Sequence, residues 1–276
     1  MSNLPRTPRF IADRIVNTVV ALSYKPESND AWETHATGFL FGKLLRAEGK
    51  TSRSAVFLVT NKHVLVSAGR SRIMLYVSAN LTAPETPSGW GEIVLVDGNN
   101  EPVWVADEIA DIAVLQIDIG KFKKAGSNLD WLTDETDCLR LEEMRQHQII
   151  EGESVYIVGF PGLLPETKRV CPVFREGVIA RIEDTYLSRQ EFFMVDANTF
   201  AGNSGGPVFL KPSPFHLSGT PGYDKGVCIG VISGGWSITG RLTKLTKSVS
   251  LAKIWPINAI DKIIEAYLQK RPLKQG

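Results

Sequence analysis

Long apolar runs and cysteine are both scarce in this sequence. No run of about 18 apolar residues, the length that crosses a bilayer as a helix, occurs in the 276 residues. The first ten residues contain two prolines and no apolar core of the length that a signal peptide needs. The three cysteines, Cys138, Cys171 and Cys228, are widely spaced and form no CxxC pair. We therefore expect a cytoplasmic protein in a reducing interior, with thiols that fill space.

Net charge is scarce as well. The chain has 31 basic and 30 acidic residues, for a formal net charge of +1, and so has no overall field that would attract nucleic acid; a local basic patch is the alternative. With 43% hydrophobic and 22% charged residues, it is an ordinary globular chain that is long enough for two cores. We expect a polypeptide as its partner, with no nucleic acid and no membrane, and we expect no cofactor and no metal.

The stretch that is most informative about function is Ala201-Gly-Asn-Ser-Gly-Gly-Pro207, which has Ser204 at its centre. Three glycines within five residues favour a tight backbone that turns one hydroxyl outward and leaves N–H groups free to point at a ligand. An acyl-transfer nucleophile needs this arrangement. A β-turn with no catalytic role is the alternative for the heptapeptide taken alone.

A serine nucleophile needs a base within hydrogen-bond reach, and the base needs a group that orients it. Of the four histidines, only His63 closes an apolar run, Ala55 to Leu65, which predicts a buried strand. We expect solvated or structural roles for the other three, His35, His147 and His216.

The orienting acid is predicted at Asp111, where a carboxylate enters the apolar run Ala110 to Ile117. An acid that enters such a strand must find a partner or lose its charge. A protonated structural aspartate or a strand cap is the alternative. The order along the chain is then His63, Asp111, Ser204.

With these residues, the sequence resembles the chymotrypsin-like (trypsin-like) serine peptidases. Val59 to His63, Asp111 to Leu115 and Gly202 to Pro207 look like that family's histidine, aspartate and serine motifs, in the same order and at similar spacings. The resemblance implies a serine endopeptidase that works through an acyl-enzyme. Ser204 would be the nucleophile, His63 the base and Asp111 the group that orients the base.

The resemblance extends to the substrate cleft. It implies that the backbone N–H groups of Gly202 and Ser204 form the oxyanion hole. The stretch Gly230 to Gly235 looks like the strand that lines the cleft. By that likeness Ser233 supports Asp111.

The same likeness implies a specificity pocket. Gly234 and Gly235 would flank the pocket for the residue before the cleaved bond. By family position, Asn198 lies near the base of this pocket. Because Asn198 is uncharged, we expect a preference for an uncharged substrate side chain.

The sequence also departs from the secreted digestive members. Asn203 stands where those enzymes have an aspartate that pairs with the amino terminus released by zymogen cleavage. We therefore expect no proteolytic activation, and an oxyanion loop that is ordered by other contacts or by a regulatory protein partner. A latent protease activated by a partner complex and a catalytically inactive binding module are the alternatives.

The Asn-Ser-Gly-Gly-Pro form looks most like the bacterial high-temperature-requirement (HtrA-like) branch. After the last expected strands, however, too few residues follow for the PDZ domain that is usual in that branch. We therefore expect a stand-alone bacterial peptidase domain.

Short β-branched segments separated by turn signals predict an all-β fold of two six-stranded antiparallel barrels with a C-terminal helix. Residues 1–122 would form the first barrel, with His63 and Asp111. Residues 123–150 would be a linker with a helix over 139–148. Residues 151–276 would form the second barrel, with Ser204, and would end in a helix that begins near Pro256.

Overall fold

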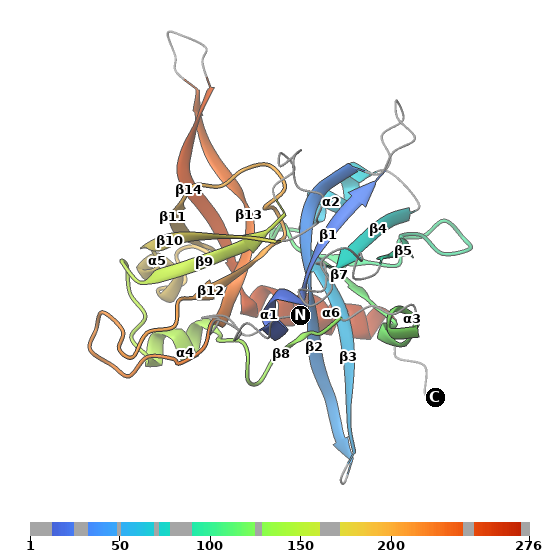
Figure 1. Ribbon diagram of the computed structural model, residues 1–276, viewed down its shortest axis with the longest axis horizontal. Coiled ribbons are helices and arrows are strands. Elements are labelled where there is room, and N and C mark those ends of the chain that lie inside the picture. Colours follow the sequence, from blue (N-terminus) through green and yellow to red (C-terminus); the bar gives the residue numbers. More distant parts are fainter. Residues whose placement is uncertain are drawn as a thin grey trace, which may run out of the picture.

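The protein has two β structures, one in each half of the chain, and a long helix that contacts both (Figure 1). The computed structural model describes residues 13–24, 33–48, 51–68, 72–77, 90–124, 129–160, 172–239 and 246–271. Among the helices in these ranges, none has the length and apolarity needed to cross a membrane. The prolines at 81–90 predict a loop between two strands, and all of this segment except Trp90, which begins a strand, lies outside the described residues, as does Cys171.

The N-terminal half forms one sheet in the strand order β5-β4-β1-β2-β3-β7-β6, with β8 paired in parallel to β2. A bridge between Val96 and Pro102, and a 3.0 Å hydrogen bond from Val103 N–H to the Leu95 carbonyl, tie the segment before β6 to the end of β5. The two ends of the strand order therefore meet. The strands are β1 (Val19–Tyr24), β2 (Glu33–Glu48), β3 (Thr51–Thr60), β4 (Arg72–Val77), β5 (Trp90–Val94), β6 (Val105–Ala106), β7 (Ala113–Gln116) and β8 (Leu132–Thr133).

The C-terminal half is a closed antiparallel barrel of six strands in the order β10-β11-β14-β13-β12-β9. It consists of β9 (Ser154–Gly159), β10 (Val173–Arg181), β11 (Phe193–Ala197), β12 (Pro207–Leu210), β13 (Val227–Thr239) and β14 (Thr246–Pro256). Together with the N-terminal sheet and the C-terminal helix α6 (Ile257–Lys270), this barrel confirms the predicted all-β fold class.

The described residues also contain five short helices, one before β1 and four between strands, namely α1 (Asp13–Val16), α2 (Lys62–Ala68), α3 (Ile119–Lys124), α4 (Leu141–Gln146) and α5 (Glu183–Tyr186). The helix predicted over 139–148 is confirmed as α4. The prediction of strand through Leu65 is wrong, because β3 ends at Thr60 and α2 begins at Lys62. The buried side chains of Thr60 and Asn61 bond backbone carbonyls of other segments at this point. An apolar run alone does not separate a long strand from a strand followed by a helical turn.

Two hairpins are long. The polar residues 42–53 predict a connection between two strands, but β2 and β3 stay paired through Lys43↔Ala55 and as far as Glu48↔Thr51. The pairing of β13 with β14 likewise extends to Thr239↔Thr246. Strand ladders use backbone groups, so polar side chains do not end them.

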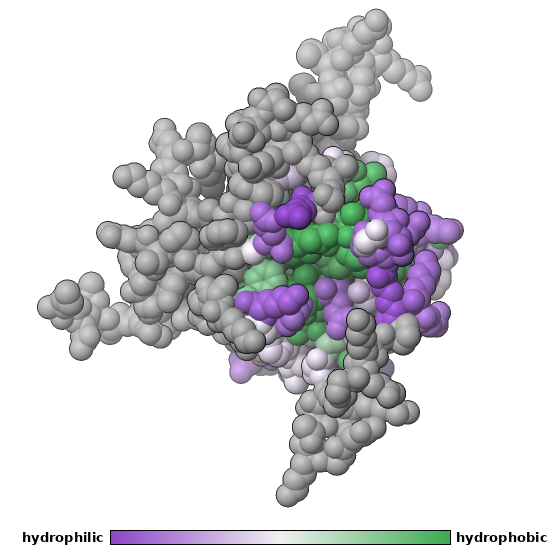
Figure 2. Space-filling model, turned by 90° about the vertical axis from the view of Figure 1, so that its right-hand side faces the viewer, coloured by the Kyte–Doolittle hydropathy of each residue, from purple (hydrophilic) through white to green (hydrophobic). Residues whose placement is uncertain are grey.

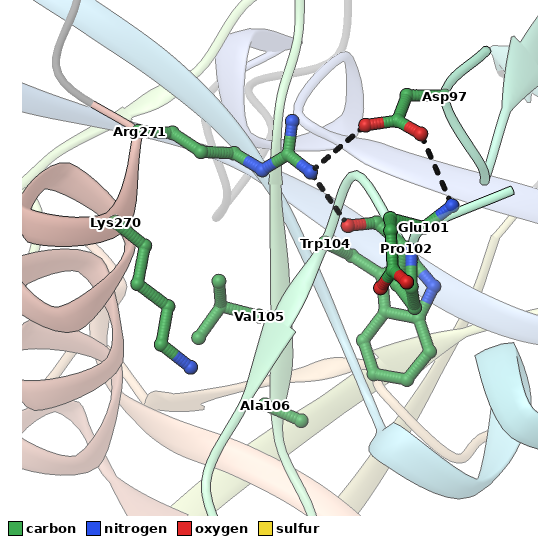
Figure 3. A pocket seen from close by; sticks show the side chains of 8 residues that line it. All are labelled: Asp97, Glu101, Pro102, Trp104, Val105, Ala106, Lys270 and Arg271. Carbon is green, nitrogen blue, oxygen red and sulfur yellow. Dashed lines mark hydrogen bonds and ion pairs between the residues drawn. The ribbon is translucent and has the colours of Figure 1, made fainter. Parts of the chain in front are cut away.

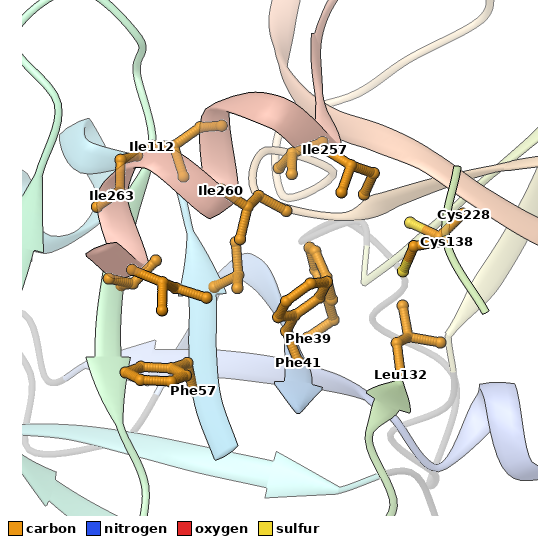
Figure 4. Packing of buried hydrophobic residues seen from close by; sticks show 14 of the residues in the cluster. Phe39, Phe41, Phe57, Ile112, Leu132, Cys138, Cys228, Ile257, Ile260 and Ile263 are labelled. Atoms are coloured by element: carbon orange, nitrogen blue, oxygen red, sulfur yellow. The ribbon is translucent and has the colours of Figure 1, made fainter. Parts of the chain in front are cut away.

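A hydrophobic cluster lies between the two β structures and is covered by α6 (Figure 4). Phe39 and Phe41 of β2 lie close to Ile257 and Ile260 of α6 in this view. The five buried side chains of α6, Ile257, Ile260, Ile263, Ile264 and Tyr267, follow the helical spacing that the sequence predicted. Burial of each of these side chains stabilises the fold by about 2 kcal/mol. Because the cluster includes residues of both halves, the helix holds the two halves together.

The surface on the right of Figure 1 separates apolar from polar side chains. Figure 2 shows that the apolar side chains of the described residues gather in the middle of this face, and that polar ones flank them. The face belongs to the N-terminal sheet side of the molecule.

Four charged side chains join β2, the segment between the two halves, and α6. Asp261 of α6 accepts a 2.8 Å hydrogen bond from Lys43 Nζ and a 2.7 Å bond from Arg140 Nε. Lys43 Nζ also lies 3.0 Å from Asp134 Oδ2. Burial works to lower the pKa of Lys43, but its bonds to Asp261 and Asp134 outweigh burial and raise the pKa. Removing one of these four side chains would therefore leave an excess of the opposite charge in a partly buried site.

We predict that Asp261→Ala lowers the free energy of unfolding by about 2–3 kcal/mol, because it removes the carboxylate that hydrogen-bonds both Lys43 and Arg140 and leaves Asp134 as the carboxylate that they share. Urea unfolding followed by circular dichroism measures the change. Glu265→Ala on the same helix is the matched control, since Glu265 is exposed. Equal effects of the two variants would contradict the prediction.

Candidate active site

His63 and Asp111 are joined at two points. The Nδ1 atom of His63 lies 2.6 Å from Asp111 Oδ2, and the His63 backbone N–H donates to Asp111 Oδ1 over 3.0 Å. His63 is the second residue of α2, and Asp111 lies in the turn before β7. The side-chain amide of Asn61 donates to the Asp111 carbonyl over 2.7 Å, which fixes this turn against the end of β3. Because Nδ1 faces the carboxylate, the Nε2 atom of the ring is left for another partner.

The carboxyl group of Asp111 is held ionised. Burial works to raise its pKa, but the hydrogen bonds and charge of His63 and the hydroxyl of Ser233 outweigh burial, so the pKa lies below its usual value. The alternative of a protonated structural aspartate therefore disagrees with the structure.

Ser233 comes from the opposite half of the molecule. Its hydroxyl donates to Asp111 Oδ2 over 2.9 Å. The pairing of β13 with β14 is irregular between Ile232 and Gly235, and Gly234 has φ +123°. An irregularity of this kind turns a side chain out of the barrel. The structure thus brings Ser233 to Asp111, as the sequence predicted, while Gly234 and Gly235 follow on the same strand.

The loop around Ser204, residues 201–207, is called the serine loop below and packs directly on the end of β3. Gly205, next to Ser204, has φ +84°, and a Cβ atom there would lie 2.2 Å from the Thr37 carbonyl oxygen and 2.4 Å from Thr60 Oγ1. Only glycine fits this position. Since β3 leads within three residues to His63, the contact places the serine loop and the histidine at the same end of the sheet.

The N–H groups of Gly202 and Ser204 have no acceptor among the described residues, and neither does that of Ala201 at the start of the loop. The N–H groups that follow Gly202 and Ser204 are bonded: Asn203 donates to the Phe200 carbonyl over 3.1 Å, and Gly205 donates to the Ile232 carbonyl over 2.9 Å. The unpaired donors of Gly202 and Ser204 are those expected to form the oxyanion hole. Gly202 itself has φ +98°.

The hydroxyl of Ser204 and the ring of His63 form no hydrogen bond with each other in the described structure. The Ser204 side chain is half-buried, whereas the His63 side chain is 48% exposed. Without a bound substrate, bonds of this kind are often long and tighten only in the complex.

Asn198 is exposed and follows the end of β11. Two residues further, the ring of Phe200 lies under the guanidinium of Arg175, whose Cζ is 4.2 Å from the ring centroid. Arg175 belongs to β10, and no motif in the sequence points to it. The structure therefore adds a positive charge beside the loop that leads to Ser204.

A hollow of about 560 Å³ lies elsewhere, between β6 and the end of α6 (Figure 3). None of the predicted site residues lines it. Arg271 bonds the Pro102 carbonyl over 2.9 Å and pairs with Asp97 at 3.7 Å, so its charge is already used to fasten the helix end. In the part of the chain that the structure describes, no three His, Cys, Asp or Glu side chains gather as a metal site.

The other three histidines lie apart from this site. His35 lies in β2 and stacks on Tyr24 with ring centroids 3.8 Å apart. His216 is buried and lies 3.6 Å from Glu153, and His147 contacts the ring of Tyr223. Their surroundings agree with structural roles.

Comparison with known proteins identifies a family to which the chain is similar. A family model described as "Trypsin-like peptidase domain" matches residues 36–212, more than half of the chain. A search of curated proteins found no match. Among solved structures, the chain is similar to the serine endoprotease from Yersinia pestis, with 18% identity and a TM-score of 0.53. That match covers 93% of this chain but only 64% of the Yersinia chain, and at this identity it supports the fold alone.

The lowered pKa of Asp111 predicts a loss of stability in acid. Because its pKa in the folded state lies below the unfolded value of about 3.9, the ionised carboxylate stabilises the fold above that pH. This stabilisation disappears as the pH falls through the folded-state pKa. Urea unfolding should therefore show a stability difference between the wild type and Asp111→Asn at about pH 5 that shrinks as the pH falls below about 4. Asp224→Asn, at an exposed position, controls for the loss of one surface charge. A difference that stays constant in acid would contradict the prediction.

Proposed function

Since this chain belongs to the trypsin-like peptidase domain family, we propose that it is a serine endopeptidase that uses Ser204, His63 and Asp111. The observation that carries the proposal is the hold of Asp111 on His63, through both the ring and the backbone N–H. This hold selects the tautomer with hydrogen on Nδ1, which is the one that can accept a proton at Nε2.

The reaction follows from these roles. Ser204 Oγ attacks the carbonyl carbon of the scissile peptide bond, and its proton passes to His63 Nε2. The ionised Asp111 stabilises the resulting imidazolium. The imidazolium gives the proton to the leaving amine, the C–N bond breaks, and an acyl-enzyme remains. Water then attacks the ester with His63 again as base, which releases the acid and restores Ser204.

The negative oxygen of each tetrahedral intermediate needs hydrogen-bond donors. We assign this role to the N–H groups of Gly202 and Ser204, supported by their lack of any acceptor among the described residues. Donors of this kind are worth about 3–4 kcal/mol of transition-state stabilisation each.

Activation without zymogen cleavage is part of the proposal. Asn203 is 2% exposed and carries a neutral amide whose Nδ2 has no partner among the described residues. A charged amino terminus inserted beside it would find no carboxylate at this position, and burying such a charge unpaired is costly.

The substrate is a polypeptide, and we propose a preference for an uncharged side chain before the cleaved bond. Asn198 supplies no charge near the predicted pocket. The guanidinium of Arg175 over Phe200 supports the same preference, because it would repel a substrate lysine or arginine.

Latency relieved by a partner protein is the second candidate. The apolar face in Figure 2 would offer a partner a place to bind.

A cytoplasmic location and the division of the chain at 122/123 and 150/151 also stay in the proposal. The location rests on the scarcity of cysteine in the sequence. Cys138 and Cys228 are buried and joined by an isolated β-bridge. Within the expected linker, β8 pairs with β2, so this segment also adds to the N-terminal sheet.

The first test is labelling with a fluorophosphonate, which the Ser204 oxygen attacks with loss of fluoride. We predict one adduct by intact mass, no adduct on Ser204→Ala, and labelling slower by at least about a thousandfold on His63→Ala. Ser213→Ala, on a loop outside the site, should label like the wild type.

The outcomes separate the candidates. A wild type that labels only with added cell extract would indicate latency relieved by a partner. A wild type that labels under neither condition would indicate a binding module and would contradict the proposed activity.

The pocket assignment predicts the effect of Asn198→Asp. A carboxylate of nearly the same shape should raise the rate of cleavage after lysine or arginine, relative to cleavage after an uncharged residue, by about 3- to 5-fold, as expected for a partly exposed ion pair. Profiling with a peptide library measures this ratio. An unchanged ratio would show that Asn198 lies outside the pocket.

A further inference from the structure

Thr37 of β2 is fully buried and connects the N-terminal sheet to the serine loop. Its backbone N–H donates to the Ser204 carbonyl over 3.0 Å, and its hydroxyl donates to the Gly202 carbonyl over 2.6 Å. The hydroxyl oxygen also accepts the Phe160 N–H over 2.8 Å. One residue thus bonds both carbonyls that flank Asn203.

These bonds fix the orientation of the peptide groups in the loop. In a trans peptide, the carbonyl and the N–H point in opposite directions, so a bonded carbonyl also sets the direction of the following N–H. Thr37 holds the carbonyls of Gly202 and Ser204, and the Gly206 N–H holds the Asn203 carbonyl over 3.0 Å. All three peptide groups from Gly202 to Gly205 are therefore fixed.

Thr37 has no room to shift. A Cβ atom at Gly159 would lie 2.8 Å from Thr37 Oγ1, and one at Gly205 would lie 2.2 Å from the Thr37 carbonyl oxygen. That carbonyl also accepts a 2.8 Å bond from Thr60 Oγ1. The hydroxyl is therefore enclosed between the two halves of the molecule, and its direction is set by the Phe160 donor.

We propose that Thr37 is the positioning residue that orders the serine loop. It takes the place of the ion pair with a newly released amino terminus, which Asn203 cannot make because it has no carboxylate. The proposal rests on the proposed function for the meaning of the loop, but the ordering itself is a structural property. A loop ordered from within the chain needs neither a new amino terminus nor a partner to hold the Ser204 N–H in its orientation.

The first experiment measures order without using activity. Amide hydrogen exchange is followed by NMR at Asn203 and Gly205, whose N–H groups are bonded in the ordered loop. Thr37→Val keeps the shape but removes the hydroxyl, and it should speed exchange at both amides by at least about 10-fold. Thr37→Ser keeps the hydroxyl and should stay within about 2-fold of the wild type.

Thr185→Val is the matched control, because Thr185 is also buried and its hydroxyl also bonds a backbone carbonyl, that of Phe192. It should leave exchange in the loop unchanged. If Thr37→Val does not fold, Thr37→Ala against Thr37→Ser makes the same comparison, since only the hydroxyl differs between them.

The second experiment reads the catalytic consequence. Thr37→Val should lower kcat by at least about 10-fold and change KM by less than about 2-fold, because the oxyanion hole acts on the transition state. The affinity for a peptidyl boronic acid, which forms a tetrahedral adduct with serine, should fall in proportion to kcat. Thr37→Ser should restore both.

Exchange that is unchanged in Thr37→Val, or that rises equally throughout the C-terminal barrel, would overturn the proposal. Faster exchange in Thr37→Val that is confined to the loop would support the ordering role. If the wild type at the same time formed no adduct with the fluorophosphonate, that second result would count against the proposed function alone. The two failures are therefore distinguishable.

Discussion

The site depends on the close contact between the serine loop and the end of β3. Gly205 lies so near Thr37 and Thr60 that a single added carbon would overlap the Thr37 carbonyl. Backbones that approach this closely bury polar groups, and each must find a partner. Thr37 and Thr60 supply those partners, so the contact that brings the halves together also shapes the loop around Ser204.

The rest of the structure holds this contact in place. The apolar face of α6 packs over the cluster between the two β structures, and Asp261 on the same helix joins Lys43 and Arg140. Apolar burial provides most of the stabilisation, whereas the charges fix the position of α6 over the cluster between the two β structures. His63 and Asp111 come from one half and Ser233 and Ser204 from the other. Any slip between the halves would separate them.

Much of the fold was predictable where the pattern is local. The periodic isoleucines of α6 and the apolar strands of the second barrel were expected because burial on one face repeats every few residues. The turn into α2 and the long β2–β3 hairpin were not. In both places the deciding interactions are backbone bonds and contacts with distant segments, which leave no periodic signal. The pairing of His63 with Asp111 was predicted and lies in the structure at 2.6 Å, while the catalytic roles stay a prediction.

The sequence by itself determined the family, the fold class and the three chemically distinctive residues, because each motif is a short run of residues whose chemistry can be recognised without its surroundings. Only the tertiary structure decided what holds those residues in place. Thr37 reaches a carbonyl 165 residues away in the sequence, and Arg140 reaches an aspartate 121 residues away. A buried threonine hydroxyl and a surface arginine are ordinary in sequence, and they acquire a role only when folding brings an acceptor within hydrogen-bond distance.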